Sequence, residues 1–415
     1  MPQATETLIY SGDYKSVIIS IELLHYSYSV FYTLEKRTTF CLGFLLPFIG
    51  LICLNLIIDP SGLIRTPQSP LNILVDNRLK KAVSVKYLQP QGIVLGSSTI
   101  NINVQHPGWQ VSPVANLFLT SPNIYEIRRY FEHAIAIAPI KQAVIGLDMF
   151  EFGKLDKNKT DRKIEYVLIT NKNGQKKHIA TQLFNAARQW RHLLLSNITT
   201  HQSIESLHSI FTDESKPPLD YEKRFFLFLE SHLQKGRKEL LQSFYKENPF
   251  IELHKIIIAA QNNDVELIFV IPPKHATYQE MYHHILGTWE NYDDWKRSLV
   301  STIEKTKSQM DKNGTTISLW DFSDCYNFIS EKISNDPPMK WFSDPIHSNT
   351  NIKYMMQNRI FNVCKEPCTT PDNFGILLTS NNIEQHLLHT RKGQENYRRT
   401  HPEEIQFLLD LYVNN

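Results

Sequence analysis

Short apolar runs that alternate with helical patterns limit what this chain can fold into more than any other feature of its sequence. Each run has the length of a buried strand and ends near glycine, proline or polar residues. These strand candidates are residues 92–95, 111–120, 142–150, 265–273 and 315–323. Apolar residues at helical spacing occupy residues 124–138, 179–211, 222–263 and 350–361. The first helix is expected to have Ser121 as its N-cap and Pro122 as its first residue. The alternation predicts an α/β fold: a three-layer, doubly wound, mostly parallel sheet with helices on both faces.

The composition is that of an ordinary globular protein and excludes several classes of function. Of the 415 residues, 42% are hydrophobic and 21% are charged, and the formal net charge is +2. A chain so close to neutral gives no general signal for nucleic acid, so we expect no nucleic-acid partner. It has no HExxH, Walker or GxGxxG motif, and its 5 cysteines lack a metal-binding spacing. We therefore expect no metal and no organic cofactor. Cys364 and Cys368 either form a disulfide or are neighbours at helical spacing.

An uncharged stretch in the first part of the chain has the properties of a membrane-spanning helix. Residues 40–58 contain no charged side chain. At ~1.5 Å per residue, a helix of this length reaches across about 30 Å of hydrocarbon. The alternatives are a buried core helix and a cleaved signal peptide, but the stretch starts late for a signal peptide and does not end in small residues. Lys36 and Arg37 precede it, and the positive-inside rule then favours a cytoplasmic N-terminus.

These features predict a single-pass protein of the plasma (inner) membrane whose main domain is extracytoplasmic, or periplasmic. The expected organisation is a short cytoplasmic segment (1–37), a transmembrane helix (38–59), an α/β domain (60–363) and a C-terminal helical extension (364–415). We expect the last segment to close with an amphipathic helix. The membrane is therefore the first expected partner.

Chemically useful residues follow several of the predicted strands. In doubly wound sheets ligands bind outside the carboxyl ends of the strands. Gly96-Ser97-Ser98, Asp148 and Asp321 all fall at such ends. The Gly-Ser-Ser stretch is either an ordinary strand-to-loop turn or a tight turn that presents Ser98 as a nucleophile.

A serine nucleophile needs a base, and a histidine works best as that base when a carboxylate orients it. Among the 16 histidines, one follows an aspartate at this kind of spacing, in Asp344-Pro345-Ile346-His347. The other histidines offer less: we expect His133 and His275 at the surface or in loops. Ser98, His347 and Asp344 are therefore the candidate nucleophile, base and orienting carboxylate.

An early strand followed by Gly96-Ser97-Ser98, and a late Asp344-x-x-His347, resemble the first and last motifs of the SGNH/GDSL hydrolase superfamily. The membrane segment makes the layout similar to the bacterial branch that includes proteins of D-alanyl-teichoic-acid synthesis and alginate O-acetylation. The resemblance implies an SGNH-like sheet and a Ser98–His347–Asp344 triad. It also implies an oxyanion hole to which the Ser98 N–H contributes.

The middle motifs of that superfamily are altered here. The second motif supplies a glycine, whereas the matching stretch, residues 116–123, has none. The third supplies an asparagine, whereas this chain has Asp148, which would repel an oxyanion if ionised. Asp148 is then a protonated donor, a ligand for a hydroxyl-rich substrate, or a capping carboxylate. The candidates for oxyanion or substrate binding are Gly96, Ser97, Asn116, Asp148 and Trp341.

The resemblance implies an enzyme, a membrane-anchored acyl hydrolase or O-acyltransferase that acts on a cell-envelope polysaccharide. Its expected partners are a cell-envelope glycan or a membrane protein that donates the acyl group. The alternative is a catalytically degraded SGNH-fold component that binds or assembles within a polysaccharide-modifying membrane complex. The altered middle motifs favour the second interpretation, and the retained triad favours the first.

Overall fold

The computed structural model describes residues 50, 77–153, 168, 170–171, 175–177, 181, 221–240, 248–309, 315–324, 326–363, 370–371 and 373–414. The described residues from 77 onward belong to one unit, Val75–Asn415. Apart from residue 50, the predicted membrane segment lies outside the described residues, and so do Cys364 and Cys368. Within the described part of the chain, no helix is both long enough and apolar enough to cross a membrane.

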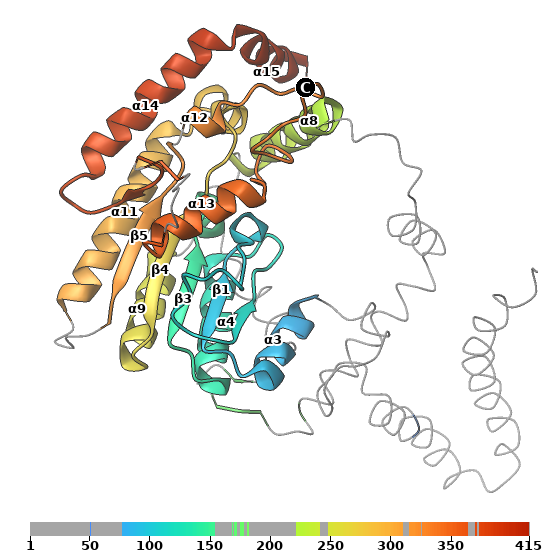
Figure 1. Ribbon diagram of the computed structural model, residues 1–415. Helices are drawn as coiled ribbons and strands as arrows, with labels where there is room; N and C mark the ends of the chain where they lie inside the picture. Colours follow the sequence, from blue (N-terminus) through green and yellow to red (C-terminus); the bar gives the residue numbers. More distant parts are fainter. Residues whose placement is uncertain are drawn as a thin grey trace, which may run out of the picture. The chain divides into compact units, whose positions relative to one another are not determined.

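A six-stranded sheet forms the centre of the fold (Figure 1). Its strands are β1 (Gly92–Leu95), β2 (Val114–Asn116), β3 (Gln142–Gly146), β4 (Glu266–Ile271), β5 (Ile317–Asp321) and β6 (Ile376–Leu377). Their order across the sheet is β2-β1-β3-β4-β5-β6, and only β6 runs antiparallel to its neighbour. The predicted α/β class and mostly parallel sheet are confirmed. The strand order reverses at β1, which makes the gap between β1 and β3 the switch point where such sheets bind ligands.

Helices cover both faces of the sheet (Figure 1). On one face α3 (Asn77–Leu88), α4 (Ile124–Ile137), α9 (Phe250–Asn262) and α11 (Trp289–Ser308) pack side by side in that order. The opposite face is covered by η2 (Ser98–Ile100), α8 (Tyr221–Leu240) and α13 (Thr350–Ile360). The other helical elements are η3 (Met149–Phe152), α10 (Ala276–Gln279), η4 (Glu280–Ile285), α12 (Tyr326–Ile329), α14 (Ile383–Thr400) and α15 (Pro402–Asn414).

The core on the second face explains how the sheet keeps its register. Val94 of β1, Val144 of β3 and Val270 of β4 are fully buried, in one cluster with Phe225 of α8 and Met356 of α13. Burying such a side chain contributes about 1.5–3 kcal/mol. Because successive strand residues point to opposite faces, a slip of one residue in any of these strands would turn its valine away from this cluster. The register that holds the carboxyl ends of β1, β3 and β4 in line is therefore strongly favoured.

Helix α4, which the sequence predicted at residues 124–138, has a different N-cap from the one expected. Asn123, not Ser121, is the N-cap of α4, and its side chain accepts a hydrogen bond from the N–H of Glu126 at 2.9 Å. Ser121 has a φ of +46° and belongs to the preceding turn. Asn123 caps the helix because its side-chain oxygen reaches an N–H of the first turn that would otherwise lack a partner.

The C-terminal part contains more than the single closing helix expected from the sequence. Strand β6 adds to the edge of the sheet beside β5, and α14 and α15 follow it. Strand β3 is also shorter than predicted, because Asp148 is the N-cap of η3 rather than a strand residue.

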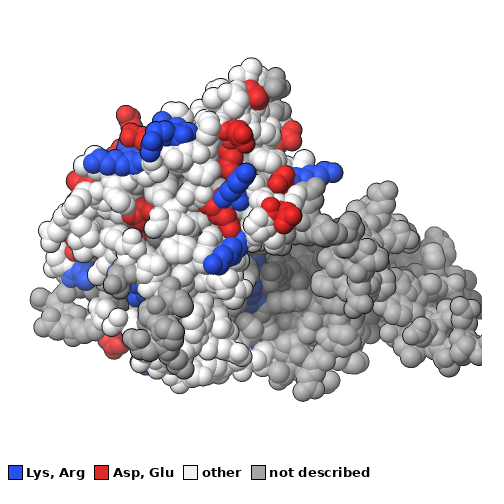
Figure 2. Space-filling model, turned by 45° about the horizontal axis from the view of Figure 1, so that its top comes forward, with Lys and Arg blue, Asp and Glu red and all other residues white. Residues whose placement is uncertain are grey.

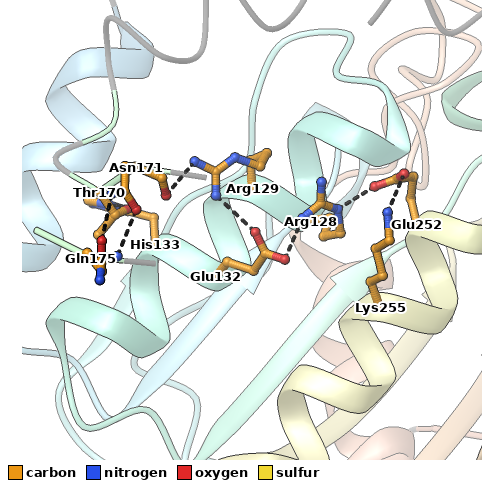
Figure 3. Close-up of polar contacts among 9 residues, drawn as sticks. All are labelled: Arg128, Arg129, Glu132, His133, Thr170, Asn171, Gln175, Glu252 and Lys255. Atoms are coloured by element: carbon orange, nitrogen blue, oxygen red, sulfur yellow. Dashed lines mark hydrogen bonds and ion pairs between the residues drawn. The ribbon is translucent and has the colours of Figure 1, made fainter. Parts of the chain in front are cut away.

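Charged side chains are largely paired on the outer side of α4. Figure 3 shows Arg128 between Glu132 and Glu252, while Lys255 approaches Glu252 from α9 at 3.3 Å. The Arg128–Glu252 pair ties α4 to α9, two helices of the same layer, while Lys255 and Glu252 both belong to α9. On the face of the molecule drawn in Figure 2, acidic and basic side chains are interspersed, in keeping with the small net charge.

Candidate active site

A glycine turn at the end of β1 positions Ser98 at the carboxyl edge of the sheet. Gly96 has a φ of +117°, which residues with a side chain rarely adopt. A Cβ atom on Gly96 would lie 2.6 Å from the carbonyl oxygen of Gly146, at the end of β3. The tight turn against β3 therefore requires glycine. Ser98 opens η2, so its N–H has no acceptor within that helix.

Ser98, His347 and Asp344 form one chain of hydrogen bonds, although Ser98 and His347 are 249 residues apart in the sequence. The Ser98 Oγ lies 2.8 Å from Nε2 of His347. The Nδ1 of His347 lies 2.7 Å from Oδ2 of Asp344. The serine is partly exposed, and the side chains of His347 and Asp344 are 29% and 6% exposed, so reactants can reach the serine and the imidazole but hardly the carboxylate.

The Asp344 carboxylate determines which nitrogen of His347 carries the proton. Burial raises the pKa of Asp344, but the hydrogen bond and charge of His347 outweigh it and hold that pKa below its ordinary value. Its Oδ1 also accepts the N–H groups of Ile346 at 3.0 Å and His347 at 2.9 Å. An ionised carboxylate favours the proton on Nδ1, which leaves the Nε2 lone pair to accept the proton of Ser98.

Backbone hydrogen bonds hold the loop that carries Asp344 and His347. The N–H of His275, which follows β4, donates to the carbonyl of Pro345 at 2.9 Å. The N–H of Ser343 donates to the carbonyl of His347 at 3.0 Å. The base is therefore anchored to the sheet through the segment that follows β4.

Two histidines that we expected at the surface or in loops are buried. His133 lies between the Thr170 hydroxyl and the Ala82 carbonyl, and burial lowers its pKa to about 4 (Figure 3 shows His133 beside Thr170). His275 is enclosed as well, and burial lowers its pKa to about 3. Both are neutral structural residues at pH 7.

Ser97 and Asn116 lie near the nucleophile but have partners of their own. The Ser97 hydroxyl lies 2.8 Å from the Thr99 hydroxyl. Asn116 is the last residue of β2. Its Nδ2 donates to Oδ1 of Asn101 at 2.7 Å, and its Oδ1 accepts the N–H of Phe118 at 3.3 Å. One of the two N–H donors of the Asn116 amide is therefore used by Asn101.

Asp148 is a capping carboxylate and one half of an ion pair. Its Oδ1 accepts the N–H of Phe150 at 3.2 Å, and its Oδ2 pairs with the Lys274 ammonium. The N–H of Asp148 donates in turn to Oε2 of Glu151 at 3.0 Å, which completes a capping box. Of the three interpretations of Asp148 left open by the sequence, capping is the one with visible hydrogen bonds.

Glu151 is a buried acid directly beneath the nucleophile turn. Burial raises its pKa well above its ordinary value, and the negative charge of Asp148 adds to the effect. The Ser97 hydroxyl interacts with this carboxyl group and lowers the pKa in part. Glu151 therefore links the turn after β3 to the turn after β1, and its burial favours the uncharged form.

Trp341 lies close to the Asp344 loop in sequence, and its side chain packs against the edge of the core cluster. Its ring is half-buried, meets Phe328 edge-on at 5.0 Å, and lies under the Lys340 ammonium at 4.4 Å. Its neighbour Phe342 is a core residue. The structure gives Trp341 no contact with the Ser98–His347 pair.

A pocket lies at the carboxyl ends of β3, β4 and β5. Asp148, Phe150, Lys274 and Ser323 are among its lining residues. The sequence did not identify Lys274 or Glu151 as residues of this site. Lys274 had a detectable signal, because it directly follows the apolar run 265–273 and so falls at a strand end. Glu151 had none beyond its place three residues after Asp148.

Asp321, another residue at a strand end, belongs to a separate buried cluster. It pairs with Lys296 at 2.6 Å and with Nε2 of His386 at 2.9 Å. Although burial raises the pKa of Asp321, these two cations hold it well below its ordinary value. The cluster ties β5 to α11 and α14 and is closed to solvent, so Asp321 is structural.

Among the described residues, no group of three or more histidine, cysteine, aspartate or glutamate side chains is arranged to bind a metal ion. No family model matches this chain, and no curated protein matches it. Its chemistry must therefore be argued from the site itself.

Proposed function

We propose that this chain is an SGNH-like acyl hydrolase or O-acyltransferase that acts on a cell-envelope polysaccharide through Ser98, His347 and Asp344. The single observation that carries the proposal is the 2.8 Å and 2.7 Å hydrogen-bond relay at the carboxyl edge of the sheet. The strand order β2-β1-β3-β4-β5, with the serine directly after β1, supports an SGNH-like arrangement.

In the proposed reaction, Ser98 Oγ attacks the carbonyl carbon of an ester while its proton moves to Nε2 of His347. The ionised Asp344 stabilises the imidazolium that results. The Ser98 N–H donates to the oxygen on which negative charge develops. The alcohol leaves with the proton from His347, and the acyl group remains on Ser98. Water or a sugar hydroxyl, deprotonated by His347, then removes the acyl group.

The cellular setting is part of the same proposal. A single membrane anchor at residues 38–59 would hold the domain outside the cytoplasm, near substrates made at the membrane. Tethering raises the effective concentration of such a glycan or of an acyl-donating membrane protein.

The alternative function is a binding or assembly component that keeps the fold without turnover. The Asp148 environment supports it, because both carboxylate oxygens are engaged and neither is a donor to an oxyanion. The triad geometry favours the enzyme, since a binding module has no need of an oriented imidazole next to a hydroxyl.

A covalent serine probe distinguishes the two functions. The full-length chain, purified in detergent, is treated with a fluorophosphonate, whose phosphorus bonds to a nucleophilic serine oxygen as fluoride leaves. We expect labelling of the parent chain and loss of at least about 100-fold in rate for Ser98→Ala. Ser308→Ala, an exposed serine on α11, is the matched control and should label like the parent. Labelling that is absent from the parent, or unchanged in Ser98→Ala, refutes the nucleophile.

A further inference from the structure

The ion pair between Asp148 and Lys274 is the most unusual feature near the proposed nucleophile. Both side chains are mostly buried, with exposed fractions of 12% for Asp148 and 15% for Lys274. The Lys274 ammonium also lies over the rings of Phe150 at 5.3 Å and Tyr278 at 5.0 Å. A buried carboxylate at this rim is therefore matched by one cation held in a fixed place.

Backbone contacts connect the segments that carry the pair to both segments that carry the triad. On the serine side, Gly96 meets the backbone of Gly146, only two residues before Asp148. Glu151 there accepts the N–H of Asp148 and interacts with the Ser97 hydroxyl. On the histidine side, the residue after Lys274 donates its N–H to Pro345, within the Asp344–His347 loop.

The charges around the pair leave Asp148 and Lys274 to balance each other. Burial raises the pKa of Glu151 well above its ordinary value, which favours the uncharged form of that acid. Burial lowers the pKa of His283, which lines the same pocket, so that base is neutral as well. If Lys274 were removed, Asp148 would be left as an uncompensated negative charge at the same edge of the sheet as Ser98.

We propose that Lys274 is a positioning residue for acyl transfer, because its ammonium neutralises Asp148 and so keeps this rim compatible with an oxyanion at Ser98. The inference rests on the proposed function. Lys274 is then needed only as long as residue 148 is an aspartate.

A double-variant experiment tests that condition. Rates of fluorophosphonate labelling are measured against probe concentration for the full-length chain in detergent. An uncompensated unit charge near the reacting atoms is worth about 10- to 100-fold in rate. We expect Lys274→Met to lower the maximal rate constant by this factor without weakening probe binding. The double variant Asp148→Asn with Lys274→Met should recover to within about threefold of the parent.

Two further variants separate charge from structure. Lys274→Arg keeps the charge and should label at nearly the parent rate. Lys255→Met, which removes a half-exposed lysine paired with Glu252 on α9, should have no effect. Thermal unfolding of every variant shows whether the fold is retained.

Each outcome decides the matter. If Lys274→Met labels like the parent, or if the double variant is as slow as Lys274→Met, the charge-balance role is wrong. A parent chain that is never labelled refutes the proposed function and this inference with it. A labelled parent with an unrescued double variant refutes the inference alone.

Discussion

A single methyl group at Gly96 tests whether the nucleophile turn is as constrained as its geometry indicates. In Gly96→Ala the new Cβ lies 2.6 Å from the Gly146 carbonyl oxygen and 3.0 Å from the Gly146 Cα and N. All three atoms belong to the backbone of β3, so no flexible side chain can move aside. The φ of +117° lies beyond the left-handed region that non-glycine residues tolerate.

Two costs lower the free energy of unfolding of Gly96→Ala. The unfavourable backbone conformation costs about 1–3 kcal/mol. Forcing β1 and β3 apart to relieve the contact costs about 1–3 kcal/mol more, as overpacking in a core does. At on the order of 2 °C per kcal/mol, the Tm should fall by about 5–10 °C. Displacement of Ser98 by about 1 Å should also slow labelling about 100-fold.

Gly287→Ala is a control that isolates the conformational part. Gly287 has a φ of +69°, and nothing lies within 4 Å of the Cβ it would gain. Its alanine variant should lose about 1–2 kcal/mol from backbone strain alone. The assay is thermal unfolding of the three proteins side by side, together with the labelling rate at Ser98. Equal losses of Tm for the two variants, or normal labelling in Gly96→Ala, would show that β1 and β3 are not in tight contact at this turn.

Two other predictions concern the buried cluster and the membrane. Burial lowers the pKa of His386, but Asp321 outweighs it and raises that pKa from 6.5 to about 9. The stabilisation of the folded protein by this charged pair is therefore complete below pH 6.5 and is lost as the pH rises through 9. The Tm deficit of His386→Gln should therefore shrink between pH 6 and pH 10, by the equivalent of about 3 kcal/mol; a deficit independent of pH contradicts the assignment. A reporter enzyme that works only outside the cytoplasm, fused after Asn415, should be active, and an inactive but folded fusion reverses the proposed orientation.

The sequence was a good guide to the elements that depend on local patterns. Apolar runs identified the positions of β1, β3, β4 and β5. The Asp344–His347 spacing identified a pair whose histidine does meet Ser98. Strand β6 escaped prediction because two residues at a sheet edge carry no periodic pattern. The N-cap of α4 was misplaced because Ser121 and Asn123 are both good capping residues, and only the backbone geometry decides between them.

Three carboxylates illustrate why the role of a site residue is harder to predict than its position. Asp148, Asp321 and Asp344 all lie at the carboxyl side of the sheet, yet they have three different roles. Their partners do: an ammonium at Lys274 for Asp148, Lys296 and His386 for Asp321, and an imidazole that faces Ser98 for Asp344. The charged partners of Asp148 and Asp321 are brought in from other elements by the fold, whereas the imidazole partner of Asp344 is only three residues away. A short-range pair is therefore readable from the sequence, while a role set by a distant cation becomes visible only once β3, β4 and β5 are aligned.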